Sequence, residues 1–592
     1  MKNKKQKYQW NLGLLYNSEK DPKIESDLKS IEMKIDFFAR KYDRPEKSYL
    51  DNNKKLLKAL NDYEELRKAT DGKPLVYFEL LRDIDATNKA APAQISLISN
   101  RLTQAHNKLE FFKNSLGDIV KNKQAVILKD KTLVKFQVFL KRIFDSAEHK
   151  LSIPEEKIMN LKSLPAYDMW VDGNERMLNL RYITWEGKKI SIAEAANKVA
   201  DISKAYERHK YDTLITDQLK AVALFSEAEI NAVVTNKKIN DKLRNYSYPH
   251  ENTVKGYDND PKVVETLVRT VTDSFSISHR FYKVKARLLG LKKLSYSDRN
   301  ARIGKIKARF SFEESLEILK ETFGGLDQKY AKILQEYFDK GQIDVLPRIG
   351  KTGGAYCCGL YTLPTFVLLN HTGDLHSLTT FAHEMGHAFH TELSKIQGPI
   401  YCHYSISLAE TASTLFEAIA LESVFDELSD EEKIIVLEEK INAEISTVMR
   451  QIACFNFEKE MHETIREKGF VDAEKLAEMH NKHMSAYLGH AFKLEKDDGY
   501  SFVRWSHIRR FFYVYTYAYG MLVSKALLRR YKQDKTFWKK IEQFLSAGGK
   551  DSPENILKEI GIDVSKQDFW KDGLGEIEDD IKKLEKLTEK KR

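Results

Sequence analysis

The sequence predicts a mainly α-helical protein with more than one lobe. Apolar residues recur at steps of three and four along most of the 592 residues, and only 12 prolines and 27 glycines interrupt this pattern. Residues 24–38 show the spacing clearly. Alternating patterns typical of strands are scarce. Because one hydrophobic core rarely serves a chain of this length, we expect at least two lobes.

Two segments depart from the helical pattern. Residues 182–192 resemble a pair of short strands around a turn at Gly187. We also expect short strands at residues 360–364 and 366–369, which lie beside glycine and proline breaks. A boundary near residue 205 divides the chain into an N-terminal helical domain, residues 1–205, and a second domain, residues 206–592, which carries the motifs described below.

The composition is that of a globular protein without a membrane span. Hydrophobic residues make up 42% of the chain and charged residues 31%. The longest strongly apolar run, residues 511–523, has 13 residues and contains four tyrosines, so it is too short to cross a bilayer. The basic residues 1–5 are not followed by an apolar stretch. We therefore find no signal peptide and expect a cytoplasmic protein.

Charge and cysteine content exclude further classes. The net charge of +10 is dispersed among nearly as many acidic residues. Nucleic-acid binding would need a concentrated basic stripe, so we expect no such partner. The four cysteines show no C-x-x-C spacing and favour neither a disulfide framework nor a cysteine metal site. The oligomeric state does not follow from these features.

Residues 383–387 read H-E-x-x-H inside a helical pattern. In a helix, positions i and i+4 lie on one face, so His383 and His387 can bind one metal ion together. Glu384 projects to the side, toward a metal-bound water, which is the minimal arrangement for zinc-assisted peptide hydrolysis. Asp374 is a suitable N-cap for this helix. The alternative is that both histidines are ordinary surface or core residues.

A catalytic zinc ion usually has three protein ligands, so a third is needed. The next predicted helix begins near Ser407 and carries Glu410 and Glu417 on one face, about two turns apart. A glutamate at the start of this helix is well placed to return to the metal. The alternative is a capping box, in which Glu410 and Ser407 only satisfy backbone N–H groups. Spacing alone does not separate the two.

An aromatic segment follows at residues 505–520 and contains His507, Tyr513, Tyr515 and Tyr517. Aromatic residues at helical spacing are most often core packing. Buried phenolic hydroxyls nevertheless need hydrogen-bond partners. Amide hydrolysis generates an oxyanion, and donors fixed around that oxygen supply much of the rate acceleration. These side chains are therefore candidate oxyanion donors.

Together these segments resemble the thimet oligopeptidase and oligoendopeptidase F family of zinc metallopeptidases, and the oligoendopeptidase F branch most closely. Residues 351–357 look like the G-A-Y segment of that branch, and residues 383–390 carry the family's glycine and its extra histidine. Residues 409–414 resemble its A-E-x-A-S-T motif. Residues 507–520, 544–549 and 568–570 are similar to its later motifs. The resemblance covers almost the whole chain.

The resemblance implies a mainly α-helical, two-lobed zincin-type metallopeptidase with a deep substrate channel and a small β-sheet beside the zinc helix. Such a protein is an oligoendopeptidase that hydrolyses internal bonds of short unstructured peptides. The resemblance implies one Zn²⁺ per chain, bound by His383, His387 and Glu410. It also implies that Glu384 acts as general base and then general acid toward a metal-activated water.

Further roles follow from the same resemblance. His507 and Tyr513, with Tyr515 or Tyr517, would donate hydrogen bonds to the oxyanion. Glu417 would orient a histidine ligand. Substrate would align by β-augmentation, through backbone groups of a short segment. That segment comprises Gly354, Ala355 and Tyr356.

The chain also departs from the family pattern. Cys357 stands where a serine is expected, Arg509 and Arg510 replace aromatic residues, and Tyr519 stands where a small residue is commoner. None of these changes removes a metal ligand, so we expect them to affect substrate preference. Two alternatives stay open at this stage. The chain could be a helical zinc carboxypeptidase or aminopeptidase with the same motif, or a non-catalytic peptide-binding relative.

Overall fold

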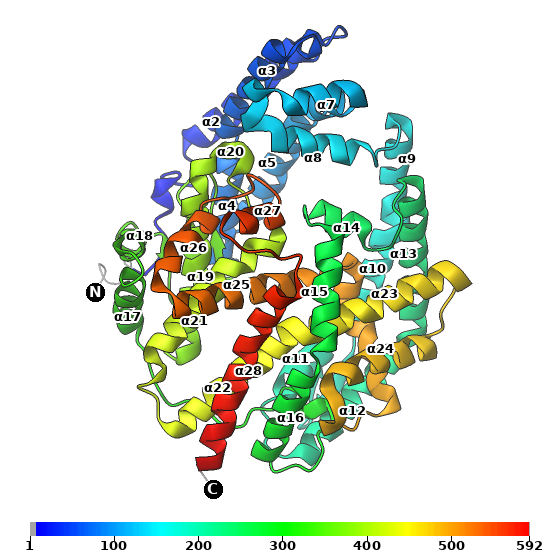
Figure 1. Ribbon diagram of the computed structural model, residues 1–592, viewed down its shortest axis with the longest axis vertical. Helices are drawn as coiled ribbons and strands as arrows, with labels where there is room; N and C mark the ends of the chain where they lie inside the picture. Colours follow the sequence, from blue (N-terminus) through cyan, green and yellow to red (C-terminus); the bar gives the residue numbers. More distant parts are fainter. Residues whose placement is uncertain (1–7, 591–592) are drawn as a thin grey trace.

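Helices build most of residues 8–590, which are the residues that this computed structural model describes (Figure 1). The predicted mainly α-helical fold is confirmed, and the helical pattern at residues 24–38 belongs to α2. The basic segment at residues 1–5, which bears on the signal-peptide prediction, lies outside the described residues. Within the described part of the chain, no helix combines the length and the apolarity that crossing a membrane requires.

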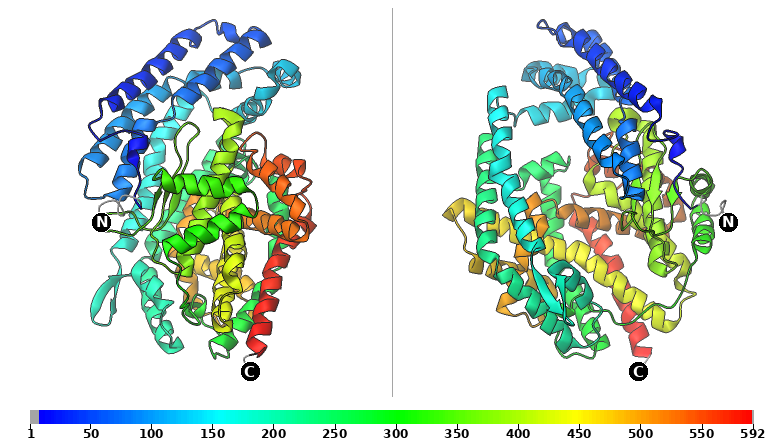
Figure 2. Two further views of the ribbon diagram at one scale, coloured as in Figure 1. Left: turned by 90° about the vertical axis from the view of Figure 1, so that its left-hand side faces the viewer. Right: turned by 180° about the vertical axis from the view of Figure 1, so that it is seen from behind.

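The helices at the N-terminal end form one group, seen at the top of Figure 1 and kept together in both views of Figure 2. Their core is built around Ile35, Phe112 and Leu140, and it also takes in Phe366 and Leu368 from much later in the chain. These helices are α2 (Pro22–Tyr42), α3 (Asn53–Ala69), α4 (Lys73–Ile84), α5 (Ala90–Asn107), α6 (Glu110–Gly117), α7 (Lys121–Lys129) and α8 (Gln137–Ala147).

A second core begins at Ile183 and extends to Leu584. Its first helices are α10 (Met169–Asn179), α11 (Ile192–Val199), α12 (Ala205–Lys220), α13 (Ala223–Leu243), α14 (Glu251–Gly256), α15 (Pro261–Asp273), α16 (Ser276–Leu288), α17 (Phe312–Gly324) and α18 (Gln328–Asp339). Helix α9 (Ile153–Ser163), which precedes them, has no buried residue. Two separate cores agree with the expectation of more than one lobe. The division at residue 205 stays a prediction.

The rest of the second core comes from the C-terminal helices. The last of them, α28, runs along the outside of α22, with Ile577, Ile581 and Leu584 buried. These helices are α19 (Leu375–Ser394), α21 (Ile406–Phe425), α22 (Asp430–Ile445), α23 (Gln451–Lys468), α24 (Ala473–Leu488), α25 (Tyr515–Gln533), α26 (Trp538–Leu545), α27 (Pro553–Glu559) and α28 (Gln567–Lys590). The short α20 (Gly398–Tyr401) packs instead against α3 of the N-terminal group.

Two small sheets complete the fold. The predicted strand pair is confirmed as an antiparallel hairpin of β1 (Tyr182–Trp185) and β2 (Lys188–Ser191). The second sheet has the order β3-β5-β4, with β3 (Ile343–Asp344) parallel and β4 (Tyr356–Cys358) antiparallel to the central β5 (Phe366–Leu368). This sheet joins the two cores, because Val367 faces the second core while both its neighbours face the first.

The strand predicted at residues 360–364 is wrong, and the strand lies at β4 instead. Residues 359–365 are an irregular segment against α19, where an added Cβ at Gly359 would lie 2.5 Å from Thr391 Cγ2. Pro364 has no N–H group to donate to a ladder. Leu363 is buried in the N-terminal core. The apolar pattern of this segment therefore reflects tertiary packing rather than a strand.

Helices α19 and α21 pack with their backbones in direct contact. An added Cβ at Gly386 would lie 2.7 Å from Ser413 Cα and 2.8 Å from Ala412 O. Only glycine permits this approach. Helix α19 begins as predicted, since the Asp374 side chain accepts from Ser377 N–H at 2.8 Å. The contact at Gly386 brings α21 alongside the H-E-x-x-H segment.

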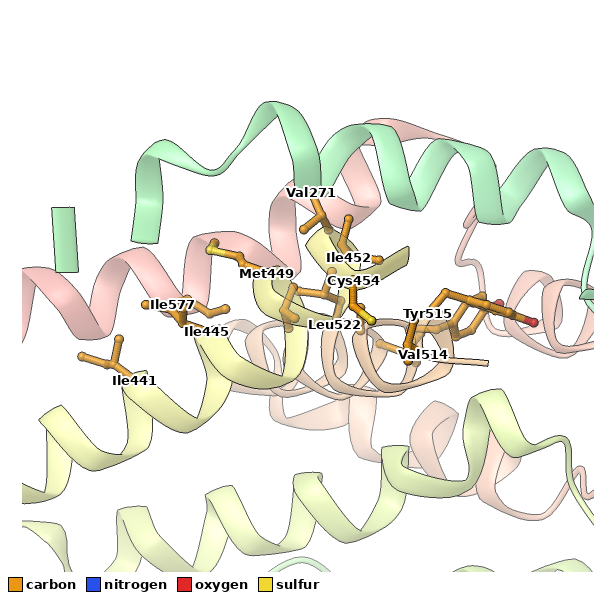
Figure 3. Close-up of a cluster of buried hydrophobic side chains, with 14 of the residues drawn as sticks. Val271, Ile441, Ile445, Met449, Ile452, Cys454, Val514, Tyr515, Leu522 and Ile577 are labelled. Carbon is orange, nitrogen blue, oxygen red and sulfur yellow. The ribbon is translucent and has the colours of Figure 1, made fainter. Parts of the chain in front are cut away.

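Helices α22 and α25 lie beyond α21 and share an apolar cluster with α15 and α28. Ile441 and Ile445 of α22, Leu522 of α25 and Ile577 of α28 all belong to the second core, and Figure 3 shows Ile445 beside Ile577 with Leu522 further along the cluster. Gly520 brings α25 onto α21, because an added Cβ there would lie 3.4 Å from Glu410 Cβ. The cluster therefore supports α25, which in turn packs against α21 at Glu410.

We predict that Gly386→Ala destabilises the protein by about 1–3 kcal/mol, since the new methyl group meets backbone atoms that cannot rotate away. Urea unfolding measures this change. Gly256→Ala is the matched control, because an added Cβ in this helical position meets no heavy atom within 4 Å. Equal stability of the two variants would contradict the close approach of α19 and α21.

Candidate metal centre and active site

Three side chains converge between α19 and α21. The donor atoms of His383, His387 and Glu410 all lie within 4.8 Å of one another, and residues 8–590 contain no other such group of three. Glu410 Oε2 is 3.3 Å from His383 Nε2 and 3.6 Å from His387 Nε2. Two imidazoles and one carboxylate are the donor set that catalytic zinc sites use. These residues therefore fit a divalent cation.

The capping-box alternative for Glu410 is wrong. The N-cap of α21 is Ser405, whose Oγ accepts from Ser407 N–H at 3.4 Å. Ser407 is thus already inside the helix, and Glu410 follows in its second turn. The Glu410 carboxylate accepts from Ser413 Oγ at 2.8 Å and otherwise faces the two histidines. Its position leaves it available as a ligand.

The His383 ring is held from behind by Glu417. Nδ1–H donates to Glu417 Oε2 at 2.9 Å. Glu417 lies on the same face of α21 as Glu410, two turns later, as its spacing predicts. This hydrogen bond directs Nε2 of His383 toward Glu410 and favours the tautomer with a free Nε2 lone pair.

Glu384 is the residue between the two ligands that faces the same site. Its side chain is only 6% exposed. Burial raises the pKa of its carboxyl to about 7, with the His383 imidazole opposing and Glu410 and Glu417 adding to the rise. A bound divalent cation would lower this pKa again. A buried carboxyl group with a raised pKa is a suitable proton carrier.

The aromatic segment brings three of its four predicted side chains together. The rings of His507 and Tyr513 stack with centroids 5.4 Å apart, and Tyr517 lies 5.9 Å from His507. The hydroxyls of Tyr513 and Tyr517 are 3.2 Å apart. Tyr517 lines the same cavity as His383 and Glu410. Burial, with Arg450 and Arg510 nearby, lowers the pKa of His507 to about 4, so its ring is neutral at pH 7.

Tyr515 does not join this group. Its side chain is fully buried, and its hydroxyl donates to Asn259 Oδ1 at 2.9 Å. Figure 3 shows its ring among the apolar cluster. Residues two apart on a helix point to opposite sides, so Tyr515 and Tyr517 cannot both face the site. Of these two tyrosines, only Tyr517 lies with His507 and Tyr513 and lines the cavity beside His383.

The turn that carries Tyr513 is strained and firmly anchored. Phe511 and Phe512 both adopt left-handed backbone angles, with φ of +46° and +64°. Such angles cost non-glycine residues on the order of 1 kcal/mol or more each. Glu458 accepts from Phe512 N–H at 2.7 Å, and Thr253 Oγ1 donates to Phe511 O at 2.8 Å. These anchors were not predicted, because they come from helices far away in the sequence.

Arg509 anchors the other end of this turn. It is 4% exposed and forms a two-point ion pair with the fully buried Glu229 of α13, at 2.9 and 2.7 Å. It also donates to the carbonyl oxygens of Phe502 and Trp505 at 3.0 Å each. Arg509 therefore points away from the metal centre. Tyr519, a second departure from the family pattern, is also buried.

The predicted substrate-aligning segment lies at one edge of the β3-β5-β4 sheet. Within residues 8–590, strand β4 pairs only with β5. Tyr356 donates its hydroxyl to Asp83 at 2.7 Å, and Asn370 Nδ2 donates to the Gly354 carbonyl at 2.7 Å. Ala355 lies between them, just before the strand. In the described part of the chain, the outer edge of β4 therefore has no strand paired to it.

Several other candidate groups lie outside the site. The extra histidine of the motif, His390, is buried and stacks on Tyr404 with centroids 3.6 Å apart. Its position excludes it from the three-ligand group. All four cysteines are free thiols, as predicted. Burial raises the pKa of Cys357, the thiol that stands where a serine is expected.

Comparisons with known proteins show the family to which the chain belongs. The family model described as Peptidase family M3 matches residues 213–576. Group B oligopeptidase PepB of Streptococcus agalactiae is 25% identical over 99% of this chain and 98% of its own length. An oligoendopeptidase F homolog of Borreliella burgdorferi is 26% identical over 94% of both chains. Oligopeptidase PepF of Bacillus subtilis is 24% identical over 85% of this chain and 74% of its own.

Solved structures show the same fold. The crystal structure of a peptidase from Chlamydophila abortus has a TM-score of 0.87 and 24% identity, and it covers 98% of both chains. The oligoendopeptidase-F from Enterococcus faecium has a TM-score of 0.69 and 19% identity over 96% of this chain and all of its own.

The helical fold, and two histidines and a glutamate whose donor atoms converge, are those of a zincin-type metallopeptidase. The chain belongs to peptidase family M3, and within it to the oligoendopeptidase F branch. It is a metalloendopeptidase. The resemblance noted from the motifs is confirmed, and the exopeptidase and non-catalytic alternatives are not favoured.

We predict that Glu229→Gln destabilises the protein by about 3–5 kcal/mol, because Arg509 then stays buried without its counter-charge. Turnover should fall as well, since the turn that carries Tyr513 loses its anchor. Urea unfolding and peptide cleavage measure the two effects. Glu194→Gln, which breaks the exposed pair with Lys198, is the control and should change stability by no more than about 0.5 kcal/mol. Wild-type stability of Glu229→Gln would show that the ion pair does not anchor the turn.

Proposed function

We propose that this protein is a zinc-dependent oligoendopeptidase that cleaves internal bonds of short, unstructured peptides. One observation carries the proposal: the donor atoms of His383, His387 and Glu410 converge within 4.8 Å, beside a buried carboxyl group. Membership of peptidase family M3 and the names of the oligopeptidase relatives support it.

His383, His387 and Glu410 would hold one Zn²⁺ ion per chain. When bound, the ion polarises the scissile carbonyl group and supplies a water that is acidic at neutral pH. Glu417 keeps the His383 ring in position through the 2.9 Å hydrogen bond to Nδ1. Two neutral imidazoles and one carboxylate would not cancel the charge of the ion. The remaining positive charge is what polarisation of the carbonyl group requires.

Glu384 moves the proton. Its carboxylate takes a proton from the attacking water while the water oxygen forms a bond to the carbonyl carbon. It then gives that proton to the amide nitrogen, and the carbon–nitrogen bond breaks to release a free amine. Burial supports this role, because it raises the carboxyl pKa and so opposes the lowering that a bound cation would cause.

His507, Tyr513 and Tyr517 donate hydrogen bonds to the oxyanion. The neutral His507 ring keeps one N–H group across the physiological pH range, because its pKa is lowered to about 4. Burial and the hydrogen bond with Tyr517 raise the pKa of Tyr513, so its hydroxyl keeps its proton. The anchored turn at Phe511 and Phe512 fixes these donors before the oxyanion forms, which is the source of their effect.

The outer edge of β4 aligns the peptide. Backbone groups at Gly354, Ala355 and Tyr356 pair with the extended substrate and do not depend on its side chains. An extended chain is needed for this pairing, so folded proteins are poor substrates. The open β4 edge supports this part of the proposal.

We predict that Glu384→Gln retains the metal but lowers turnover about 100- to 10,000-fold, since the proton carrier is lost and the ligands are kept. The assay follows an internally quenched peptide blocked at both ends, because only an endopeptidase cleaves it. Metal content of the same preparation is the internal control. Turnover close to that of the wild type would contradict the role of Glu384, and a blocked peptide left intact by the wild-type protein would favour an exopeptidase.

A further inference from the structure

A cavity of about 520 Å³ opens beside the metal centre. Its wall includes His383, Glu410 and Glu417 on one side, together with Tyr517. The cavity is enclosed by α19, α21, α22 and α25. It is therefore continuous with the place where the scissile bond must lie, and a substrate side chain next to that bond can enter it.

Most of the cavity wall is apolar. Leu375 of α19, Leu421 of α21, Val436 of α22, and Met521 and Leu528 of α25 contribute to it. These side chains favour a long substrate side chain, whose methylene groups pack against them, over a small or strongly hydrated side chain.

Two lysines in the wall are already neutralised. Lys525 pairs with Glu444 at 2.6 Å. Lys440 lies 3.4 Å from Glu444 and forms a further ion pair with Asp580. Two cations thus face two carboxylates, and this cluster leaves no free positive charge for an acidic substrate.

One acidic side chain in the wall is not neutralised in this way. Glu439 lies on the face of α22 that carries Val436 and Ala443, opposite the buried Ile441 of Figure 3. Within residues 8–590, no ion pair or hydrogen bond to its carboxylate is found. Glu439 is itself exposed to the open part of the cavity, so its carboxylate is free to meet a charged group that enters.

In the described part of the chain, none of the positively charged groups near Glu439 forms an ion pair with its carboxylate. Arg302 interacts with it electrostatically but pairs with Asp201 at 2.9 Å, and the buried Lys285 pairs with Glu438 at 2.5 Å. His376 also lines the cavity. Its side chain is exposed.

We propose that this cavity accepts one side chain of the bound peptide and that Glu439 selects a lysine or arginine there. The apolar wall packs against the methylene stem, and the Glu439 carboxylate pairs with the ammonium or guanidinium group at its end. The inference rests on the proposed peptidase function and names the class of substrate that this site prefers.

The test uses quenched peptides that are blocked at both ends and differ at one position beside the cleaved bond. Lysine, glutamine, leucine or glutamate stands there, on either side of the bond in turn. At one of these positions we expect kcat/KM for lysine to exceed that for glutamine by about 10- to 100-fold, the range for a charged hydrogen bond. Glu439→Gln should remove this preference, and Glu439→Lys should shift it toward glutamate.

Two controls complete the experiment. Asp430→Asn, an exposed acid on the same helix, should keep the lysine preference. Binding of the same peptides to the Glu384→Gln protein, followed by calorimetry, should show the same ranking without turnover. Cleavage with no preference for lysine, or an unchanged preference in Glu439→Gln, would overturn this inference and leave the proposed function intact. Failure of the wild-type protein to cleave any of the peptides would overturn both.

Discussion

The site depends on the backbone contact of α19 with α21 at Gly386. Two helices with ordinary side chains between them have axes about 8–10 Å apart, whereas here an added Cβ would meet the Ser413 backbone at 2.7 Å. This approach places Glu410 within 3.6 Å of both histidine ligands. It also brings Glu417 to the back of the His383 ring. One glycine thus determines which residues can share a metal ion.

A second set of contacts holds the turn that carries Tyr513 and leads to Tyr517. The left-handed turn at Phe511 and Phe512 is unfavourable by itself, so it persists only where neighbouring groups stabilise it. Glu458 and the Arg509–Glu229 ion pair provide this support from α23 and α13. Packing against those distant helices therefore orients Tyr513 and Tyr517, in keeping with the general need for preorganised donors.

The sequence predicted the parts of this protein that depend on local pattern. Helical periodicity, the spacing of His383 and His387, and the position of Glu410 all follow from contacts within one or two helices. Glu229 and Glu439 could not be found in this way, because both resemble ordinary acidic residues of a helix until the fold brings their surroundings together. The strand expected at residues 360–364 failed for the same reason, since that segment packs as an irregular loop.

Metal content most directly tests the claim that the crossing of α19 and α21 builds the catalytic centre. Zinc should be measured by mass spectrometry in Glu410→Ala and in a control variant, Glu422→Ala. Glu422 lies on the same helix as Glu410, but its carboxylate pairs with Lys532. The account predicts that Glu422→Ala retains about one zinc ion per chain and that Glu410→Ala loses it. Full zinc content in folded Glu410→Ala would contradict the account.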